Sequence, residues 1–461
     1  MDSQQDLINF FIEKGFLISP ETITDNNIEI IKKIVSSKEL VKALPLVITK
    51  RDIEKIGTKK GLFKRKRELE EKNIKDNHEK TGSVNFRIKV DHKEKSSEQT
   101  VKEFVDYFRS RYKSVLKILK THNELNNLTS ISKIRNMDPN QNLSFVAMVN
   151  NISLSKNNNY FIEVEDLTSR TKVIVSNTRQ EAFEKAKRIS LDEVLGFSGV
   201  LSRDKNVVFC DDIIWPDVPL GNELKKLQKE EYAVFLGDPH IGSKSFLKKE
   251  FETLIKWLNG KIGSSEQKEI ASKIKYIFLV GDLVDGVGIY PNQKEDLEIW
   301  DIYKQYEELA KYIRKFPKQA QIFISPGNHD AVRLSEPQPN IYRDMCKELY
   351  EIPNVSLVSN PAVVNIGGTE GRQGLDVLIY HGYSFPYFAD HVEEIRLKGG
   401  LSKTDLIMKY LLTSRHLAPS HGSTLYVPNY KEDPLFIKEI PDIFVTGHIH
   451  RSMVKNYRGI T

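Results

Sequence analysis

The chain has 461 residues, of which 39% are hydrophobic and 29% are charged, a balance typical of a folded globular protein and not of a disordered one. Its length predicts two or three domains, and its formal net charge of +6 is small. No apolar run reaches the roughly 18 residues of a transmembrane helix, and the two widely spaced cysteines argue against disulfides, so we expect a cytoplasmic protein without membrane contact.

The first quarter of the chain is predicted to be a small helical region followed by a basic linker. Residues 1–45 carry apolar side chains at helical spacing, and we expect this region to dock on another surface because it has little core of its own. Residues 46–125 are predicted to be a linker with one helix over 101–120. The stretch 51–125 holds 21 Lys and Arg against 13 Asp and Glu, most densely at 64–67. This charge fits contact with nucleic-acid phosphates and a solvated linker equally well.

Residues 126–220 contain short β-rich runs with a helical stretch near 180–188 between the third and the fourth. This order is typical of an OB-type β-barrel. Such barrels often bind single-stranded nucleic acid through aromatic side chains, but here the strand aromatics fit a barrel core equally well. The aromatics are Tyr160, Phe161, Phe197 and Phe209, and the runs are 145–149, 160–164, 172–175, 195–201 and 207–214.

Residues 230–461 alternate short apolar runs with helical stretches, which predicts a sheet sandwich built from βαβ units. We expect helices over 248–258, 297–316, 343–350 and 403–412. Polar motifs follow the apolar runs, and since carboxyl ends of parallel strands meet at one edge of a sheet, one shared site is predicted. The motifs are Asp238-Pro239-His240, Gly281-Asp282, Gly327-Asn328-His329-Asp330, His381-Gly382 and Gly447-His448-Ile449-His450.

The motif side chains offer carboxylate, amide and imidazole groups but no thiolate, a mixture that suits Mn²⁺, Fe²⁺, Zn²⁺ or Mg²⁺. They are too many for one tetrahedral ion, so we expect two divalent ions that share one carboxylate. Such a pair holds a phosphate and lowers the pKa of a bound water, which can then attack phosphorus. His329 is expected to point away from the ions and to stabilise the transition state or protonate the leaving oxygen. The candidate ligands are Asp238, His240, Asp282, Asn328, His381, His448 and His450.

At these motifs the chain resembles the calcineurin-like metallophosphoesterases, which implies an αββα sandwich for residues 230–461. Three longer strings, 327–339, 415–419 and 441–450, are similar to the small subunits of the archaeal family D DNA polymerases. That resemblance implies a helical N-terminal region, a linker, an OB barrel and a phosphoesterase domain. It also implies a 3′–5′ proofreading exonuclease that works beside a large polymerising subunit on single-stranded or frayed 3′ ends of DNA.

Carried over by motif, the resemblance assigns Asp238, His240 and His450 to one ion, most plausibly Mn²⁺. The second ion would be held by Asn328, His381 and His448, with Asp282 as the bridge and His329 on the phosphate.

The chain departs from the family pattern at two places. Leu334-Ser335 stands where Gln-Ala is usual. The sheet domain would also need closing strands after His450, so we expect either a truncated chain or completion by a partner.

Two other functions stay open: a scaffold that docks the polymerase with little turnover, and a phosphomonoesterase of the same superfamily. Arg333 and Arg415 are candidates for contact with substrate phosphate, although surface or interdomain ion pairs would explain them equally well. Asp285 is expected to support a ligating histidine and not to bind metal itself. His416 and His421 are expected to be structural.

Overall fold

The computed structural model describes residues 17–18, 31, 47–48, 84–93, 99–222, 224–369, 373–428 and 432–461. The chain separates into two units, residues 1–80 and 81–461. In the first unit the described residues include two short parallel strands, β1 (Leu17–Ile18) and β2 (Val47–Ile48). Most of the predicted helical region and the basic cluster at 64–67 lie outside the described residues. Across the described ranges, no helix combines the length and apolar character that crossing a membrane requires.

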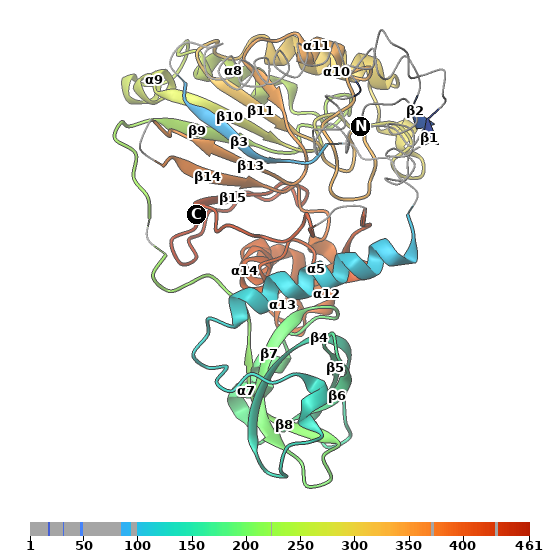
Figure 1. Cartoon of the computed structure of the whole chain (residues 1–461). Helices are drawn as coiled ribbons and strands as arrows, with labels where there is room; N and C mark the ends of the chain where they lie inside the picture. Colours follow the sequence, from blue (N-terminus) through green and yellow to red (C-terminus); the bar gives the residue numbers. More distant parts are fainter. Residues whose placement is uncertain are drawn as a thin grey trace. The chain divides into compact units, whose positions relative to one another are not determined.

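A closed barrel confirms the predicted OB-type fold (Figure 1). The strand order is β4-β5-β6-β8-β7, and residues alternate between a buried inner face and a more exposed outer face. A short helix, α7 (Gln180–Ala186), separates the third strand from the fourth. The strands are β4 (Asn142–Leu154), β5 (Tyr160–Glu165), β6 (Arg170–Val175), β7 (Val194–Leu201) and β8 (Val207–Ile214).

The helix predicted over 101–120 is α5 (Val101–Leu119), which begins with a capping box formed by Thr100 and Glu103. Its Tyr112, Val115 and Leu119 pack against the barrel in one apolar cluster. Its Tyr107 belongs to a second cluster, formed mainly with residues between 378 and 460. Packing therefore explains both aromatic side chains: Tyr112 contacts the barrel, and Tyr107 contacts the C-terminal part of the unit.

The rest of the unit is a four-layer αββα sandwich, as predicted (Figure 1). The first sheet has the order β12-β11-β10-β9, the second has the order β15-β14-β13-β3, and a shared apolar cluster lies between them. Strand bounds are β9 (Tyr232–Leu236), β10 (Ile274–Val280), β11 (Gln321–Ser325), β12 (Val355–Leu357), β13 (Ala362–Ile366), β14 (Leu375–Ile379) and β15 (Ile443–Val445).

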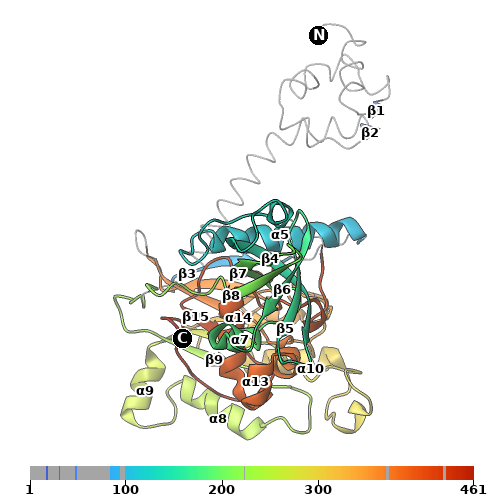
Figure 2. The ribbon, with the colours of Figure 1, turned by 90° about the horizontal axis from the view of Figure 1, so that it is seen from below.

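Helices cover both outer faces of the sandwich. The first sheet packs on α8 (Lys248–Leu258), α9 (Ser265–Ser272) and α10 (Ile302–Ile313), and α8 and α9 lie side by side in both views (Figure 1 and Figure 2). The second sheet packs on α12 (Phe385–His391), α13 (Glu393–Leu397) and α14 (Thr404–Ser414).

Several details differ from the sequence prediction. Residues 86–91, expected to lie in the linker, form strand β3 (Phe86–Asp91), which pairs antiparallel with β13. The helix expected over 343–350 is only α11 (Lys347–Tyr350), and the one expected over 297–316 is shortened to α10. Helices α9, α12 and α13 were not predicted, because each is short and its apolar residues do not repeat over enough turns.

Candidate metal centre

The predicted metal ligands follow strands whose carboxyl ends meet at one edge of the sandwich. Strands β9, β10 and β11 run parallel to one another, and β14 and β15 run parallel in the second sheet. Asp238, Asp282 and Asn328 come just after the first three strands, while His381 and His448 follow the other two. The topology therefore gathers motifs separated by more than 200 residues of sequence.

At five of the seven candidate ligands the backbone lies in the left-handed region that residues with a side chain rarely adopt. Asp238 has a φ of 55°, His240 and Asp282 both have 47°, His448 has 71° and His450 has 52°. Such conformations cost free energy and cluster at functional sites, where the surrounding structure holds them in place. The strained turns direct the side chains of successive motifs towards a common point.

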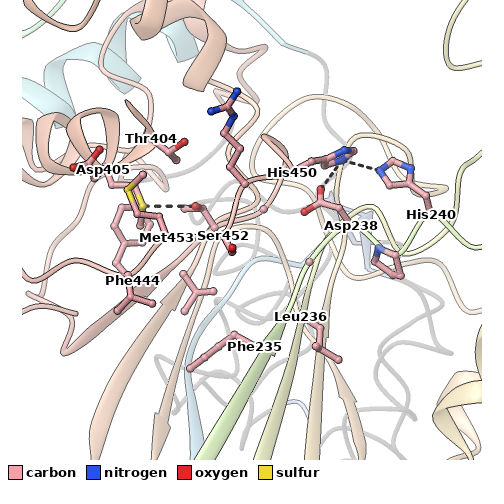
Figure 3. Close-up of a pocket in the computed structure, with 18 of the residues that line it drawn as sticks. Phe235, Leu236, Asp238, His240, Thr404, Asp405, Phe444, His450, Ser452 and Met453 are labelled. Carbon is pink, nitrogen blue, oxygen red and sulfur yellow. Dashed lines mark hydrogen bonds and ion pairs between the residues drawn. The ribbon is translucent and has the colours of Figure 1, made fainter. Parts of the chain in front are cut away.

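One potential metal-binding group consists of Asp238, His240 and His450, whose ligand atoms all lie within 4.8 Å of one another. Nε2 of His240 is 3.1 Å from Nε2 of His450, which is 3.5 Å from Oδ1 of Asp238. Figure 3 shows these three side chains converging from two loops, Asp238 and His240 from the loop after β9 and His450 from the loop after β15. Two imidazole nitrogens and one carboxylate oxygen form a donor set that suits a divalent transition metal.

A second group consists of Asp282, His381 and His448, again within 4.8 Å. Nε2 of His381 lies 3.2 Å from Oδ2 of Asp282 and 3.1 Å from Oδ1 of Asn328, so the predicted amide ligand adjoins this group. The same Oδ2 of Asp282 is 3.8 Å from Nε2 of His240 in the first group. Asp282 thus lies between the two groups, where a bridging carboxylate is needed.

His329 contacts Asp282 and Asp285 and belongs to neither of the two groups described above. Its backbone N–H donates to Oδ1 of Asp282 at 2.8 Å, and its Nδ1 lies 2.7 Å from the carbonyl oxygen of Asp285. Because a carbonyl only accepts, Nδ1 carries a hydrogen and Nε2 is the remaining nitrogen. The rings of His329 and His240 meet edge to face, with centroids 4.6 Å apart.

A set of polar side chains orients the ligands from behind. Oδ1 of Asp285 is 3.2 Å from Nδ1 of His240, and Gln293 donates to Oδ2 of the same carboxylate at 2.8 Å. His381 points Nδ1 at the carbonyl of Val280, 3.1 Å away, and donates its backbone N–H to Asn360 at 2.8 Å. These contacts leave Nε2 of each histidine directed into the site, as partners of metal-binding histidines commonly do.

Sequence reasoning assigned no role to Asp330, the last residue of the Gly-Asn-His-Asp motif. Its Oδ2 accepts from the backbone N–H of Gly327 at 2.8 Å and of Leu283 at 3.2 Å, and its Oδ1 accepts from the hydroxyl of Tyr306 at 3.1 Å. Burial, followed by the nearby charge of Asp282, raises its pKa to about 7. Asp330 therefore ties the loop after β11 to the loop after β10.

Electrostatics at the site favour positive charge beside Asp282. Burial would raise the pKa of this carboxyl, but His381 beside it holds the pKa well below its usual range. Burial lowers the pKa of His381, yet the charge of Asp282 outweighs it and the pKa rises to about 9. Burial and the charge of His381 lower the pKa of His448 to about 4. A buried carboxylate that attracts positive charge suits cation binding, and burial together with the charge of His381 keeps His448 neutral.

A cavity of about 1170 Å³ opens next to the first group of ligands. His329 and Tyr290 lie on its wall together with Asp238, His240 and His450. Farther from these residues the wall is mixed, with the apolar Phe235, Leu236, Phe444 and Met453 near the polar Thr404, Asp405 and Ser452 (Figure 3). A substrate in this cavity could therefore reach both a ligand group and Nε2 of His329.

Arg333 and Arg415, the two candidates for phosphate contact, both donate hydrogen bonds to backbone carbonyls. The Arg333 guanidinium donates to the carbonyls of Ser335 and Pro337. Arg415 is 4% exposed, donates to the carbonyls of Ile437 and Lys438, and is not on the wall of the cavity. Its surroundings favour a structural role and give no support to phosphate contact.

His416 and His421 have the packing expected of structural residues. His416 is buried, with Nε2 2.8 Å from Oδ2 of Asp433. The His421 ring stacks on Tyr426, with ring centroids 5.4 Å apart.

Comparison with known proteins gives one family match and a set of archaeal relatives. The calcineurin-like phosphoesterase family matches residues 233–452. The DNA polymerase II small subunit of Methanothermobacter thermautotrophicus is 38% identical over 78% of this chain and 71% of its own length. Proteins of the same name from Archaeoglobus fulgidus and Pyrococcus furiosus are 37% and 36% identical, and the chain spans 70% and 58% of their lengths. A likeness to the telomere capping protein Ten1 from Saccharomyces pombe, with 20% identity over 19% of the chain and a TM-score of 0.14, is too weak to argue from.

Proposed function

Because the chain belongs to the family of DNA polymerase II small subunits, we propose that it is the 3′–5′ proofreading exonuclease of an archaeal replicative DNA polymerase. The observation that carries the proposal is the pair of ligand groups at one sheet edge, which share access to Asp282 beside a large cavity. A metallophosphoesterase domain implies divalent ions, and a polymerase small subunit implies a large catalytic partner. The proposal adds the reaction and the substrate, which is DNA with a single-stranded or frayed 3′ end.

In this proposal the chain holds two ions, with Mn²⁺ favoured. One is bound by Asp238, His240 and His450, and the other by Asn328, His381 and His448, with Asp282 shared. The nitrogen and oxygen donors suit Mn²⁺, Fe²⁺, Zn²⁺ and Mg²⁺ alike, so the choice of Mn²⁺ follows the family resemblance. Two bound ions would act as Lewis acids on the phosphodiester and lower the pKa of the attacking water.

His329 is proposed to act on the phosphate. The hydrogen bond from Nδ1 to the Asp285 carbonyl fixes the ring, and the residue lies on the cavity wall, so Nε2 is available to substrate. In the reaction a water loses a proton to solvent as its oxygen forms a bond to phosphorus, and the bond from phosphorus to the 3′ oxygen of the preceding nucleotide breaks. Because Nδ1–H of His329 is bound to the Asp285 carbonyl, the protonated form of the ring would use Nε2–H to donate a hydrogen bond to the developing charge or to give a proton to the departing 3′ oxygen, and it would take a proton back from solvent. The products are a nucleoside 5′-monophosphate and a shortened strand with a free 3′ hydroxyl.

The test is digestion of a 5′-labelled single-stranded oligonucleotide with Mn²⁺. We expect a ladder that shortens from the 3′ end and that is lost in both His448→Ala and His329→Ala. The matched control is His391→Ala, because His391 is an exposed histidine on α12, away from the motifs. Variants are compared only where circular dichroism shows that they are folded.

Other outcomes separate the competing functions. No digestion by the folded chain, even with the large subunit added, would contradict the exonuclease and favour a scaffold. Hydrolysis of p-nitrophenyl phosphate at a rate similar to that of the bis-ester, without action on DNA, would indicate a phosphomonoesterase.

A further inference from the structure

The outer wall of the barrel carries a row of apolar side chains across three neighbouring strands. Phe161 on β5 pairs with Ile174 on β6, which pairs in turn with Phe209 on β8. Directly paired residues lie on the same face of a sheet, so the three side chains form one continuous row. With strands spaced roughly 4.8 Å apart, the backbones that carry the two phenylalanines are about 10 Å apart.

This row is exposed, whereas the other strand aromatics form the core. Phe161 is 37% exposed and Phe209 is 47% exposed, while Tyr160 is 6% exposed and Phe197 is fully buried. Of the four strand aromatics, two therefore belong to the barrel core and two lie on the outer face, where a ligand could contact them. Helix α5 packs on β4 and β7 instead and does not cover the row. The neighbouring exposed side chains give this wall an apolar patch that a ligand can contact.

The loops that flank the row carry positive charge. Parallel pairing of Lys172 with Val207 and of Ile174 with Phe209 places the loop 202–206 on one side of the row, while the loop 155–159 joins β5 on the other. Lys156, Arg203 and Lys205 in these loops make no ion pair in the part of the chain that the structure describes.

Other charges on this wall are already neutralised. Lys172 lies 3.4 Å from Glu163, Arg170 lies 2.7 Å from Glu165, and Arg179 pairs with Asp211. Asp204 in the flanking loops accepts hydrogen bonds from Ser202 and Asn206 and keeps its negative charge, but the three cations of these loops outnumber it. The uncompensated charge around the row is therefore positive, which complements a phosphate backbone.

We propose that this wall binds single-stranded DNA, with bases stacked on Phe161 and Phe209 and phosphates held by Lys156, Arg203 and Lys205. Separated aromatic platforms inside a cationic rim bind single strands, since a duplex keeps its base faces stacked internally. The outer face of β5, β6 and β8, with the loops 155–159 and 202–206 on either side, has the geometry for such a ligand. The inference deepens the proposed function by giving the substrate strand a holding site, but it does not require that the chain hydrolyse DNA.

Binding is measured on the full chain by fluorescence anisotropy with a labelled oligo-dT strand in excess EDTA, so that hydrolysis plays no part. We expect Phe161→Ala and Phe209→Ala each to weaken binding about tenfold, and the double variant to weaken it further. Lys205→Gln should reduce the dependence of the affinity on salt, because fewer counterions are released. Tyr303→Ala is the control, since Tyr303 on α10 is also a half-exposed aromatic and should leave the affinity unchanged.

A second readout separates this inference from the proposed function. The two phenylalanine variants should hydrolyse bis-p-nitrophenyl phosphate with Mn²⁺ at the wild-type rate, which also shows that they are folded. Unchanged oligo-dT affinity in both variants would overturn the inference, even if the chain proves to be an exonuclease. Loss of affinity for the large subunit with oligo-dT binding intact would overturn it too, in favour of a protein-docking wall. Weakened oligo-dT binding in a chain without nuclease activity would support the inference and contradict the proposed exonuclease.

Discussion

At the scale of single residues, glycines next to the candidate metal ligands have no room for a side chain. A Cβ added to Gly281 would overlap Nδ1 of His381, and one added to Gly327 would overlap Oδ1 of Asp282. Gly281 also has a φ of +76°, which a side chain would strain. The loops can approach the ligands this closely because both positions are glycine.

Gly327→Ala is expected to displace Asp282 and to lower the hydrolysis of a bis-ester with Mn²⁺ roughly 100-fold, because small displacements of catalytic groups have large effects on rate. Overpacking should also lower the free energy of unfolding by about 1–3 kcal/mol. Gly221→Ala is the matched control, since a Cβ there meets nothing within 4 Å. The rate and the Mn²⁺ affinity are measured together by a colorimetric assay and calorimetry. Wild-type Mn²⁺ affinity and rate in Gly327→Ala would show that this loop does not set the position of Asp282.

At the scale of elements, the strand ends that carry the candidate ligands could be predicted from sequence, whereas the short helix that begins at Gln293 and strand β3 could not. An apolar run followed by Asp, Asn or His is local information, so Asp238 and His448 could be identified as candidate ligands from sequence. Gln293 begins a short 3-10 helix just after the Gly-Asp motif but belongs to no motif itself, and its bond to Asp285 appears only in the folded chain. Strand β3 alternates Phe86, Ile88 and Val90, but its partner β13 is more than 270 residues away. Pairing over such a distance is decided by tertiary structure and not by local pattern.

Helix α5 is fixed to the C-terminal part of the sandwich by a buried charge cluster. Nε of Arg111 lies 2.7 Å from Oδ2 of Asp433, and His416 lies 2.8 Å from the same oxygen. Burial, followed by the charge of Arg111, lowers the pKa of His416 to about 4, so it is neutral in the folded chain at pH 7. The carboxyl of Asp433 is desolvated, but His416 and Arg111 hold its pKa well below the usual range.

The free energy of unfolding should therefore fall as pH is lowered from about 6.5 to about 4, because the unfolded chain then binds a proton on His416 that the folded chain does not. The loss from this residue is at most about 3 kcal/mol. Below that range the protonation of Asp433 in the unfolded chain continues the loss, since its folded pKa is depressed. His416→Asn should flatten the upper part of the profile in urea unfolding at several pH values. An unchanged slope between pH 6.5 and 4 in this variant would assign the acid sensitivity to other groups.

At the scale of the whole molecule, the barrel and the sandwich share a buried carboxylate. Oε1 of Glu193, on the barrel, accepts from the hydroxyl of Ser414 at 2.6 Å and from the indole of Trp215 at 3.2 Å. Its Oε2 accepts from the backbone N–H of Ser190 at 2.7 Å. Arg188 and Glu394 add an ion pair at 3.2 Å between the same two parts. In the proposed function, single-stranded DNA bound on the barrel wall would reach the candidate metal centre only if this connection keeps the two parts in a fixed relation.

Glu193→Ala removes the shared acceptor and leaves three buried donors without this partner, which should cost about 3–5 kcal/mol of stability. We expect calorimetry to show the barrel and the sandwich unfolding in separate transitions, and digestion of long single strands to slow more than hydrolysis of a small bis-ester. Glu184→Ala is the control, because Glu184 is exposed on α7 and pairs only with Lys187 among the described residues. The contrary outcome is that Glu193→Ala unfolds in one transition and lowers the hydrolysis rates of both substrates equally. That outcome would show that the carboxylate contributes stability alone, and that the proposed movement of DNA from the barrel to the candidate metal centre does not depend on it.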